Sequence, residues 1–213
     1  MHNYQQEFLE LAIHKQVLRF GRFELKSGRI SPYFFNAGLF NDGRSLAVVG
    51  RCFAQAIDSA ELDFDMLFGP AYKGIPLVAA VAIAMQDLYQ KNIPFTFNRK
   101  EIKDHGEGGQ LVGAELTGRV LVIDDVISAG TSVRESAATI NKRGAELAGV
   151  AIALDRQERG SSGLSAAQEV EQVLAAKLVS VVDLDSLVVF LEDRTGLDVD
   201  LNAVREYRDR YGV

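Results

Sequence analysis

The amino-acid sequence predicts an α/β protein with a central, mostly parallel β-sheet flanked by helices. Short apolar segments rich in valine and isoleucine alternate along the chain with longer segments of helical periodicity. The strand-like segments are apolar at successive positions, which is typical of a sheet covered by helices on both faces. With 213 residues, of which 47% are hydrophobic, the chain can form one sizeable core, and we expect residues 1–213 to form a single domain.

The N-terminal part of the chain shows signals for a helix, a hairpin and a second helix. Residues 4–20 carry apolar side chains at helical spacing, which predicts an amphipathic helix. The stretch FELKSGRISPYFFNAGLF has a Ser-Gly and a Ser-Pro turn signal between short apolar pieces, which predicts a hairpin-like section. Asp42 is a suitable N-cap for a helix that continues to about Ala60.

Strands and helices alternate in the rest of the chain. Strands are expected at residues 66–69, 94–97, 119–124, 148–155 and 178–184. Helices are expected at residues 74–90, 132–144 and 165–175, and one or two further helices end the chain. The segment 98–113 shows neither periodicity and is predicted to be irregular.

The composition narrows the possible environments and partners. A net charge of −6 argues against general nucleic-acid binding. The single cysteine, Cys52, cannot form an internal disulfide and fits a reducing compartment. The chain begins with a polar stretch, and its longest apolar run, residues 75–85, is too short to span a bilayer. We therefore expect a cytoplasmic protein that binds neither nucleic acid nor membranes.

Polar residues stand at the ends of three predicted strands. Asp124 and Asp125 end the strand 119–124, Tyr72-Lys73 lies just beyond 66–69, and Arg156 just beyond 148–155. Ligands of open α/β sheets bind outside the carboxyl ends of the strands. We therefore expect these three groups to line one cleft.

The stretch VLVIDDVISAGTS, residues 120–132, combines an acidic pair with a loop of small and hydroxyl residues. Neighbouring strand residues point to opposite faces, so Asp124 and Asp125 can grip two different groups. A buried carboxylate without a partner costs several kcal/mol, so a cleft or a partner is expected. Small residues let backbone N–H groups approach a ligand, and the loop leads into a helix N-terminus that favours an anion. The carboxylates then suit ribose hydroxyls, and the loop suits a 5′-phosphate.

An ordinary strand-to-helix turn is the simplest alternative, with aspartate as a cap and serine or threonine as the N-cap. It accounts for the hydroxyl residues but not for two consecutive acids. Other nucleotide-binding motifs do not fit the chain. In GPAYKGIP, Ile75 stands where a Walker A motif has its lysine, and in GEGGQLVG, Leu111 replaces the last glycine of a dinucleotide fingerprint.

VLVIDDVISAGTS resembles the signature of the type I phosphoribosyltransferases, enzymes that use 5-phosphoribosyl 1-pyrophosphate (PRPP). Over nearly its full length the chain is also similar to the bacterial orotate phosphoribosyltransferase family, in LKSGRISPYFFNAG, GPAYKGIPL, NRKEIKDHGEGG and ALDRQERG. The resemblance implies a type I phosphoribosyltransferase fold, in which about residues 1–40 form a small base-binding hood over the strand ends and residues 98–113 form a mobile lid loop. It implies transfer of the phosphoribosyl group from PRPP to orotate, giving orotidine 5′-monophosphate and pyrophosphate, in de novo pyrimidine biosynthesis.

The resemblance also assigns site residues. Those implied to bind PRPP are Lys26, Tyr72, Lys73, Arg99, Lys100, Lys103, His105, Asp124, Asp125, Val126, Ile127, Ser128, Ala129, Gly130, Thr131 and Ser132. Those implied to bind orotate are Lys26, Phe34, Phe35, Ser128 and Arg156. Those implied to be catalytic are Asp124, Asp125, Lys26, Lys73, Arg99 and Lys103. Ser128 departs from the threonine frequent at this position but keeps the hydroxyl.

The chemistry of these residue types suits orotate, a flat pyrimidine that carries a carboxylate. Phe34 and Phe35 offer aromatic surface for the ring, and Arg156 can bind the carboxylate with two parallel hydrogen bonds. The basic residues of segment 98–113 suit a lid that binds pyrophosphate and excludes water. A charged run of this kind is by default a solvated loop.

The resemblance further implies Mg²⁺, held mainly by PRPP, pyrophosphate and water rather than by a protein metal site. It implies a homodimer in which the lid loop of one subunit reaches the active site of the other. Three alternatives stay open: a phosphoribosyltransferase for another base such as uracil or a purine, a PRPP-sensing regulator without turnover, and a nucleoside hydrolase. A regulator usually carries a basic DNA-binding module, and a hydrolase would need neither a phosphate loop nor a basic lid.

Overall fold

The computed structural model of the chain describes residues 1–25, 27–103, 109–127, 131–160, 163–194 and 199–213. These residues form a two-stranded hairpin, a six-stranded sheet and the helices around them. The strands are β1 (Leu18–Glu24), β2 (Ile30–Phe35), β3 (Met66–Gly69), β4 (Phe95–Lys103), β5 (Gly109–Gly113), β6 (Arg119–Asp124), β7 (Glu146–Asp155) and β8 (Lys177–Asp183). The helices are α1 (Asn3–His14), η1 (Ala37–Leu39, 3-10), α2 (Gly43–Ser59), α3 (Gly74–Tyr89), α4 (Thr131–Lys142), α5 (Ala166–Leu174), α6 (Leu184–Glu192) and α7 (Leu201–Tyr211).

The six-stranded sheet has the order β5-β4-β3-β6-β7-β8. The pairs β4–β3, β3–β6, β6–β7 and β7–β8 are parallel, and the edge strand β5 is antiparallel to β4. The predicted α/β class with a mostly parallel sheet is confirmed. Because β6 is a central strand, its carboxyl end, with the acidic pair, lies in the middle of one edge of the sheet.

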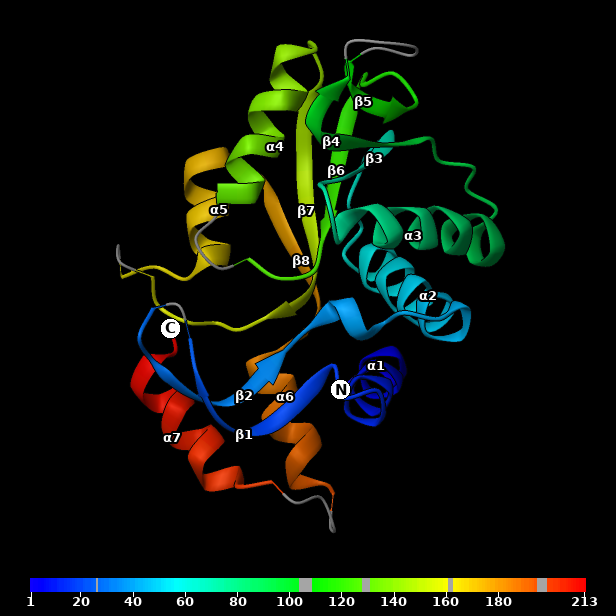
Figure 1. Ribbon diagram of the computed structural model, residues 1–213. Coiled ribbons are helices and arrows are strands. Elements are labelled where there is room, and N and C mark those ends of the chain that lie inside the picture. The colour runs from blue at the N-terminus through cyan, green and yellow to red at the C-terminus, as the bar shows by residue number, and fades with distance from the viewer. Residues whose placement is uncertain (26, 104–108, 128–130, 161–162, 195–198) are drawn as a thin grey trace.

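Helices cover both faces of this sheet. Along β6, Leu121 and Ile123 pack in an apolar cluster with residues of α1, α2 and α3, whereas Val120 and Val122 pack in a second cluster with residues of α4 and α5. Figure 1 shows the two groups of helices on opposite sides, with α2 and α3 on the right and α4 and α5 on the left. The burial of successive β6 residues therefore follows from the two-sided covering that the sequence predicts.

The N-terminal part confirms the predicted hairpin but shortens the first helix. The helix expected over residues 4–20 ends at His14, and Leu18 already begins β1. Gln16 has a positive φ of 56°, which ends the helical path, and Val17 and Leu18 are buried. The prediction failed there because a pair of apolar residues fits the period of a helix and the start of a strand equally well.

The hairpin β1–β2 packs against the C-terminal helix α7. In Figure 1 the hairpin, α6 and α7 lie together below the six-stranded sheet. The ring of Tyr33 on β2 meets the ring of Tyr207 on α7 edge to face, with centroids 6.1 Å apart. The first and last segments of the chain thus share one part of the fold, and two helices end the chain, as predicted.

The predicted helices and strands from Asp42 onward occur close to their expected bounds, with one exception. The segment 98–113 was predicted to be irregular, and this is wrong for its described backbone. β4 continues to Lys103, and β5 pairs with it so that Phe97 lies opposite Val112. A charged hairpin at the sheet edge needs no alternation of apolar residues, so its strands leave little trace in the sequence. Residues 104–108 lie outside the described part of the chain.

Among the described residues, no helix is both long enough and apolar enough to pass through a bilayer.

Candidate active site

The acidic pair lies where β6 leaves the sheet, and both residues are buried, with 7% of Asp124 and 6% of Asp125 exposed. Asp124 lies toward α4, where its Oδ2 accepts a hydrogen bond of 3.0 Å from the hydroxyl of Ser132. Asp125 lies toward the start of α3, where its Oδ2 is 2.6 Å from Nζ of Lys73. The two carboxylates therefore diverge, as expected for neighbouring residues at a strand end.

The two carboxylates differ in their electrostatic surroundings. Burial raises the pKa of Asp124 to about 6, and the nearby charge of Asp125 acts in the same direction. The backbone N–H of Asp125, 2.8 Å from Asp124 Oδ1, and the Ser132 hydroxyl lower the pKa and oppose this rise. Asp125 has an ammonium partner instead, the half-exposed Lys73. Both carboxylates can accept hydrogen bonds from the hydroxyl groups of a sugar, which are neutral donors.

Backbone contacts place Arg156 at the same edge of the sheet. The carbonyl oxygen of Asp125 accepts hydrogen bonds from the amides of Ala153 and Leu154, at 2.9 and 3.2 Å. Both amides belong to the last part of β7, and Arg156 follows this strand directly. The strand ends of β6 and β7 thus bring the acidic pair and Arg156 to one side of the sheet.

The turn between β3 and α3 packs tightly against β6. A Cβ on Gly74 would lie 2.6 Å from Cδ of Pro70 and 2.9 Å from the carbonyl oxygen of Ile123, and one on Gly69 would lie 2.4 Å from the carbonyl oxygen of Gly74. Only glycine fits at these two positions. The glycines of GPAYKG therefore allow this turn to come close to the acidic pair.

The same turn brings several predicted residues together. The amide of Ala71 donates to Oδ1 of Asn98 at 2.7 Å, which ties the turn to β4. Farther along β4, Nζ of Lys100 lies 4.9 Å from the ring centre of the exposed Tyr72. Tyr72, Lys73, Lys100 and Asp125 thus form one cluster. It is rich in cations, as a site for a phosphorylated ligand requires.

The remaining residues predicted for the PRPP site are placed in part. Arg99 is half-buried on β4, and the backbone of Lys103 ends that strand. Val126 is half-buried, Ile127 is buried, and Thr131 and Ser132 are exposed in the first turn of α4. The residues or side chains outside the described part are Lys26, the side chain of Lys103, His105, Ser128, Ala129 and Gly130.

Arg156, predicted to bind the orotate carboxylate, is held by protein groups. Its Nε donates to Oε1 of Glu158 at 2.7 Å, and its Nη2 lies 2.6 Å from the same oxygen. Nη2 also donates to the hydroxyl of Ser31 on the hairpin at 3.1 Å. The guanidinium lies over the ring of Tyr33, 4.3 Å from its centre. The hairpin and the end of β7 therefore meet at this arginine.

The two predicted aromatic residues of the hairpin point to different surroundings. Phe35 is buried against Phe8 and Phe40, with ring centroids 6.3 and 6.4 Å away, and so belongs to the core. Phe34 is half-buried, stacks on Phe23 at 5.5 Å and lies below the guanidinium of Arg19. The structure thus offers the ring of Phe34, but not that of Phe35, as accessible aromatic surface.

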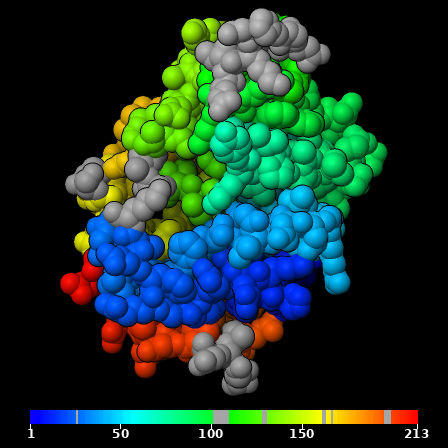
Figure 2. Space-filling view, in the orientation of Figure 1, coloured from blue at the N-terminus to red at the C-terminus, as the bar shows by residue number. Residues whose placement is uncertain are grey.

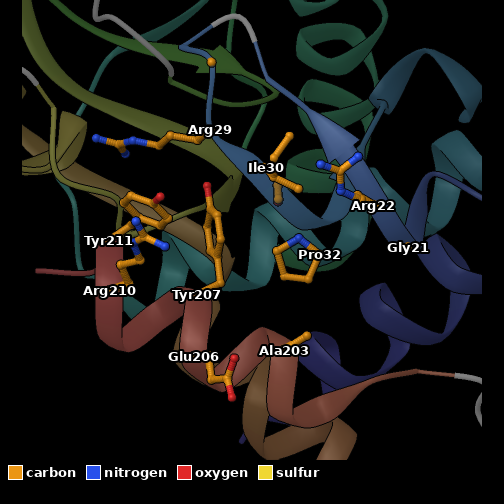
Figure 3. A pocket seen from close by; sticks show the side chains of 12 residues that line it. Gly21, Arg22, Arg29, Ile30, Pro32, Ala203, Glu206, Tyr207, Arg210 and Tyr211 are labelled. Carbon is orange, nitrogen blue, oxygen red and sulfur yellow. The ribbon is translucent and has the colours of Figure 1, made fainter.

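A cavity of about 520 Å³ lies between the hairpin and α7 (Figure 3). It is lined by Gly21, Arg22, Gly28, Arg29, Ile30, Ser31, Pro32, Ala203, Glu206, Tyr207, Arg210 and Tyr211. The acidic pair is not part of its lining. Ser31 and Tyr207 belong both to the cavity wall and to the hydrogen-bond network around Arg156. The surface is hollowed separately between the hairpin and the green and yellow segments above it (Figure 2).

Four residues of the site were not predicted: Ser31, Asn98, Glu158 and Tyr207. Ser31 and Glu158 accept hydrogen bonds from Arg156, Asn98 accepts one from the β3–α3 turn, and Tyr207 donates one to Glu158. Glu158 lies two positions after Arg156, and this spacing was a usable signal for an ion pair. Nothing in the sequence around Tyr207 indicates its role, because its partner is 49 residues away.

The fold and the site together define a phosphoribosyltransferase. The family described as "Phosphoribosyl transferase domain" matches residues 38–182. Two curated relatives named orotate phosphoribosyltransferase match all 213 residues and all of their own length, with 55% identity in Pectobacterium carotovorum and 56% in Pseudoalteromonas translucida. The chain belongs to the orotate phosphoribosyltransferase family.

Solved structures agree with this membership. The crystal structure of orotate phosphoribosyltransferase from Francisella tularensis is 41% identical, with a TM-score of 0.85 over 97% of this chain and 99% of that chain. The Mycobacterium tuberculosis orotate phosphoribosyltransferase in complex with PRPP is 25% identical, with a TM-score of 0.64 over 86% of this chain and 98% of that chain. The type I phosphoribosyltransferase fold predicted from the sequence is confirmed.

Proposed function

We propose that this chain catalyses the reversible transfer of the 5-phosphoribosyl group from PRPP to orotate, giving orotidine 5′-monophosphate and pyrophosphate. The observation that carries the proposal is the diverging pair Asp124 and Asp125 at the end of a central strand, directly before a loop that opens α4. The PRPP complex of the Mycobacterium tuberculosis relative supports the choice of ribosyl donor.

The acidic pair acts on the ribose in this proposal. The C1′–O bond to pyrophosphate breaks and a bond from C1′ to a ring nitrogen of orotate forms. Positive charge grows on the ribosyl group as pyrophosphate departs. Asp124 and Asp125 accept hydrogen bonds from the ribose hydroxyls, and their charge also favours the cationic ribosyl group. The hydroxyl donors replace Ser132 and Lys73 as partners of the two carboxylates.

The cations nearby stabilise the departing pyrophosphate. Lys73 and Lys100 lie beside the site on the β3–α3 turn and on β4, and Arg99 belongs to the same strand. Lys103 acts from the end of β4, with His105 from the adjoining segment that is outside the described residues. The 5′-phosphate lies at the start of α4, where the N–H groups of the first helical turn favour an anion; residues 128–130, which precede this helix, are outside the described part of the chain.

Orotate lies between the hairpin and the end of β7. Arg156 binds its carboxylate, and the accessible ring of Phe34 packs on the pyrimidine. Phe35 contributes through its backbone, because its ring is buried in the core. Lys26 lies at the junction of the base and PRPP, and the hydroxyl of Ser128 contacts orotate; both residues are outside the described part of the chain.

Mg²⁺ is proposed as the metal of the reaction. No group of three or more metal-ligating side chains occurs among the described residues. Mg²⁺ keeps several waters and binds substrate phosphates, so it would be held mainly by PRPP, pyrophosphate and water. When bound, the ion neutralises charge on the pyrophosphate as it leaves.

We also propose a cytoplasmic homodimer whose segment 98–113 closes over the site of the neighbouring subunit. The support for the lid is the basic sequence of this segment. The support for the cytoplasm is the single buried cysteine.

The direct test is the ultraviolet absorbance of orotate on mixing it with the protein, PRPP and Mg²⁺. We expect orotate to be consumed only when all three are present, and uracil and purine bases not to accept the phosphoribosyl group. Preferential transfer to another base would instead assign a different acceptor. Tight binding of PRPP without transfer to any base would contradict the enzyme and favour a regulator.

A further inference from the structure

We propose that Glu158 and Tyr207 are positioning residues for Arg156, so that the C-terminal helix α7 takes part in selecting a base that carries a carboxylate. This inference rests on the proposed function, in which Arg156 binds the orotate carboxylate. Neither residue needs to touch the substrate for this role.

The guanidinium of Arg156 is fixed on one side only. Its Nε and Nη2 both lie within 2.7 Å of Glu158 Oε1, and Nη2 also reaches the Ser31 hydroxyl at 3.1 Å. Within the described residues, Nη1 has no hydrogen-bond partner. Nη1 is therefore the nitrogen available to a ligand carboxylate, and the contacts of Nε and Nη2 with Glu158 and Ser31 set its direction.

Glu158 is in turn held from two sides. Its Oε1 accepts a hydrogen bond of 2.9 Å from the hydroxyl of Tyr207, which is buried on α7. Its Oε2 lies 3.6 Å from Nη1 of Arg29 on the hairpin segment. Only 15% of the Glu158 side chain is exposed. Hydrogen bonds to a carboxylate in such a place are stronger than those between neutral groups.

The Glu158 carboxylate beside Arg156 weakens electrostatic binding of an anionic ligand, so we attribute its presence to orienting the guanidinium. The charge of Glu158 offsets part of the attraction between Arg156 and an incoming carboxylate. An arginine that is already oriented loses less side-chain freedom when it binds, and it presents its planar edge in one direction. The network therefore favours a flat ligand whose carboxylate lies at one angle, as on a planar pyrimidine.

Tyr207→Phe tests this role because it removes one hydroxyl and leaves every charge in place. We expect the KM for orotate to rise about 3–10-fold, less than for direct loss of a hydrogen bond to a charged group because Tyr207 acts through Glu158, with kcat and the KM for PRPP nearly unchanged. Tyr211→Phe is the matched control. It lies on the same helix and the same cavity wall, and its hydroxyl has no hydrogen-bond partner among the described residues. This variant should leave all three constants unchanged.

The inhibition constant of uracil distinguishes a role in orienting Arg156 from a general role in maintaining the shape of the base site. Uracil lacks the carboxylate, so its inhibition constant should not change in Tyr207→Phe. Equal weakening of uracil and orotate, a lower kcat with an unchanged KM for orotate, or an equal effect of Tyr211→Phe would each overturn the inference. Thermal melting of both variants corrects for any loss of folded protein.

The measurements distinguish failure of the proposed function from failure of the positioning role of Glu158 and Tyr207. A wild-type protein that does not transfer to orotate overturns the function and this inference together. A wild-type protein that does, with Arg156→Ala raising the KM for orotate strongly and Tyr207→Phe leaving it unchanged, overturns the inference alone. Arg156→Ala without any effect on this KM would remove Arg156 from the base site.

Discussion

The acidic pair and the guanidinium of Arg156 lie at neighbouring strand ends but are held in different ways. Asp124 accepts a hydrogen bond from Ser132, eight residues away, within one strand–loop–helix unit. Arg156 donates to Ser31, 125 residues away, and its partner Glu158 is held by α7. The ribose side of the site is therefore built within the six-stranded sheet and its connections, including the contact of Asp125 with Lys73, whereas the base side also depends on the packing of both ends of the chain.

The two regions also differ in the charged groups that they offer a ligand. The ribose side holds two buried carboxylates, with Lys73 and Lys100 beside Asp125, whereas the base side holds two arginines around one carboxylate. Hydroxyl groups suit the first region and an anionic ring suits the second. If this comparison is right, variants in one region should change the kinetics of one substrate only.

Asp125→Asn should have the largest effect. It removes a charge that balances the ribosyl cation, so kcat should fall about 10²–10³-fold, as for loss of a preorganised electrostatic group. The KM for orotate should stay unchanged in steady-state assays. Asp87→Asn, which changes an exposed carboxylate on α3, should behave as the wild type. A large rise in the KM for orotate would show that the two regions are not separate.

Lys103→Ala should lower kcat nearly as much, because it removes a cation from the proposed lid. If the lid serves the neighbouring subunit, mixing this variant with Asp125→Asn should form hybrid dimers with one intact site. We then expect partial recovery of orotate turnover above that of either variant alone. If mass spectrometry shows that hybrid dimers have formed but orotate turnover does not recover, a lid shared between subunits is contradicted.

Arg156→Lys should change the base side alone. Lysine keeps the charge but lacks the planar guanidinium that Glu158 and Ser31 orient, so the KM for orotate should rise about 10-fold. The KM for PRPP should not change. Equal rises in both KM values would break the comparison between the two regions.

Asp124→Asn tests the ribose side through stability rather than through kinetics. The pKa of Asp124 is raised from 3.8 to about 6, so the folded protein binds a proton there more tightly than the unfolded chain. Ionisation of this group therefore lowers stability as the pH rises from about 4 to about 6, and the loss stays constant above.

The variant should remove that loss and stabilise the protein at pH 8 by roughly 1–3 kcal/mol. Urea unfolding of both proteins between pH 4 and pH 8 measures the difference. A stability difference that does not grow between pH 4 and pH 6 would show that burial does not disfavour the Asp124 carboxylate.

The sequence alone was enough to predict the sheet, most helices and the acidic pair, because strand burial and a strand–loop–helix unit are local patterns. The divergence of Asp124 and Asp125 follows from the period of a strand. The end of α1 and the strands of the segment 98–113 were not predicted, since apolar pairs and charged edge strands carry an ambiguous signal. The contacts of Ser31 with Arg156 and of Tyr207 with Glu158 were not predictable either, because they form only through long-range packing.

The most direct measurement is a crystal structure of the protein with PRPP and Mg²⁺. We expect the ribose hydroxyls on the carboxylates of Asp124 and Asp125, the 5′-phosphate at the start of α4, and Lys73 turned from Asp125 toward the pyrophosphate. PRPP bound elsewhere, with Asp125 still paired to Lys73 and Asp124 still bonded to Ser132, would contradict the account.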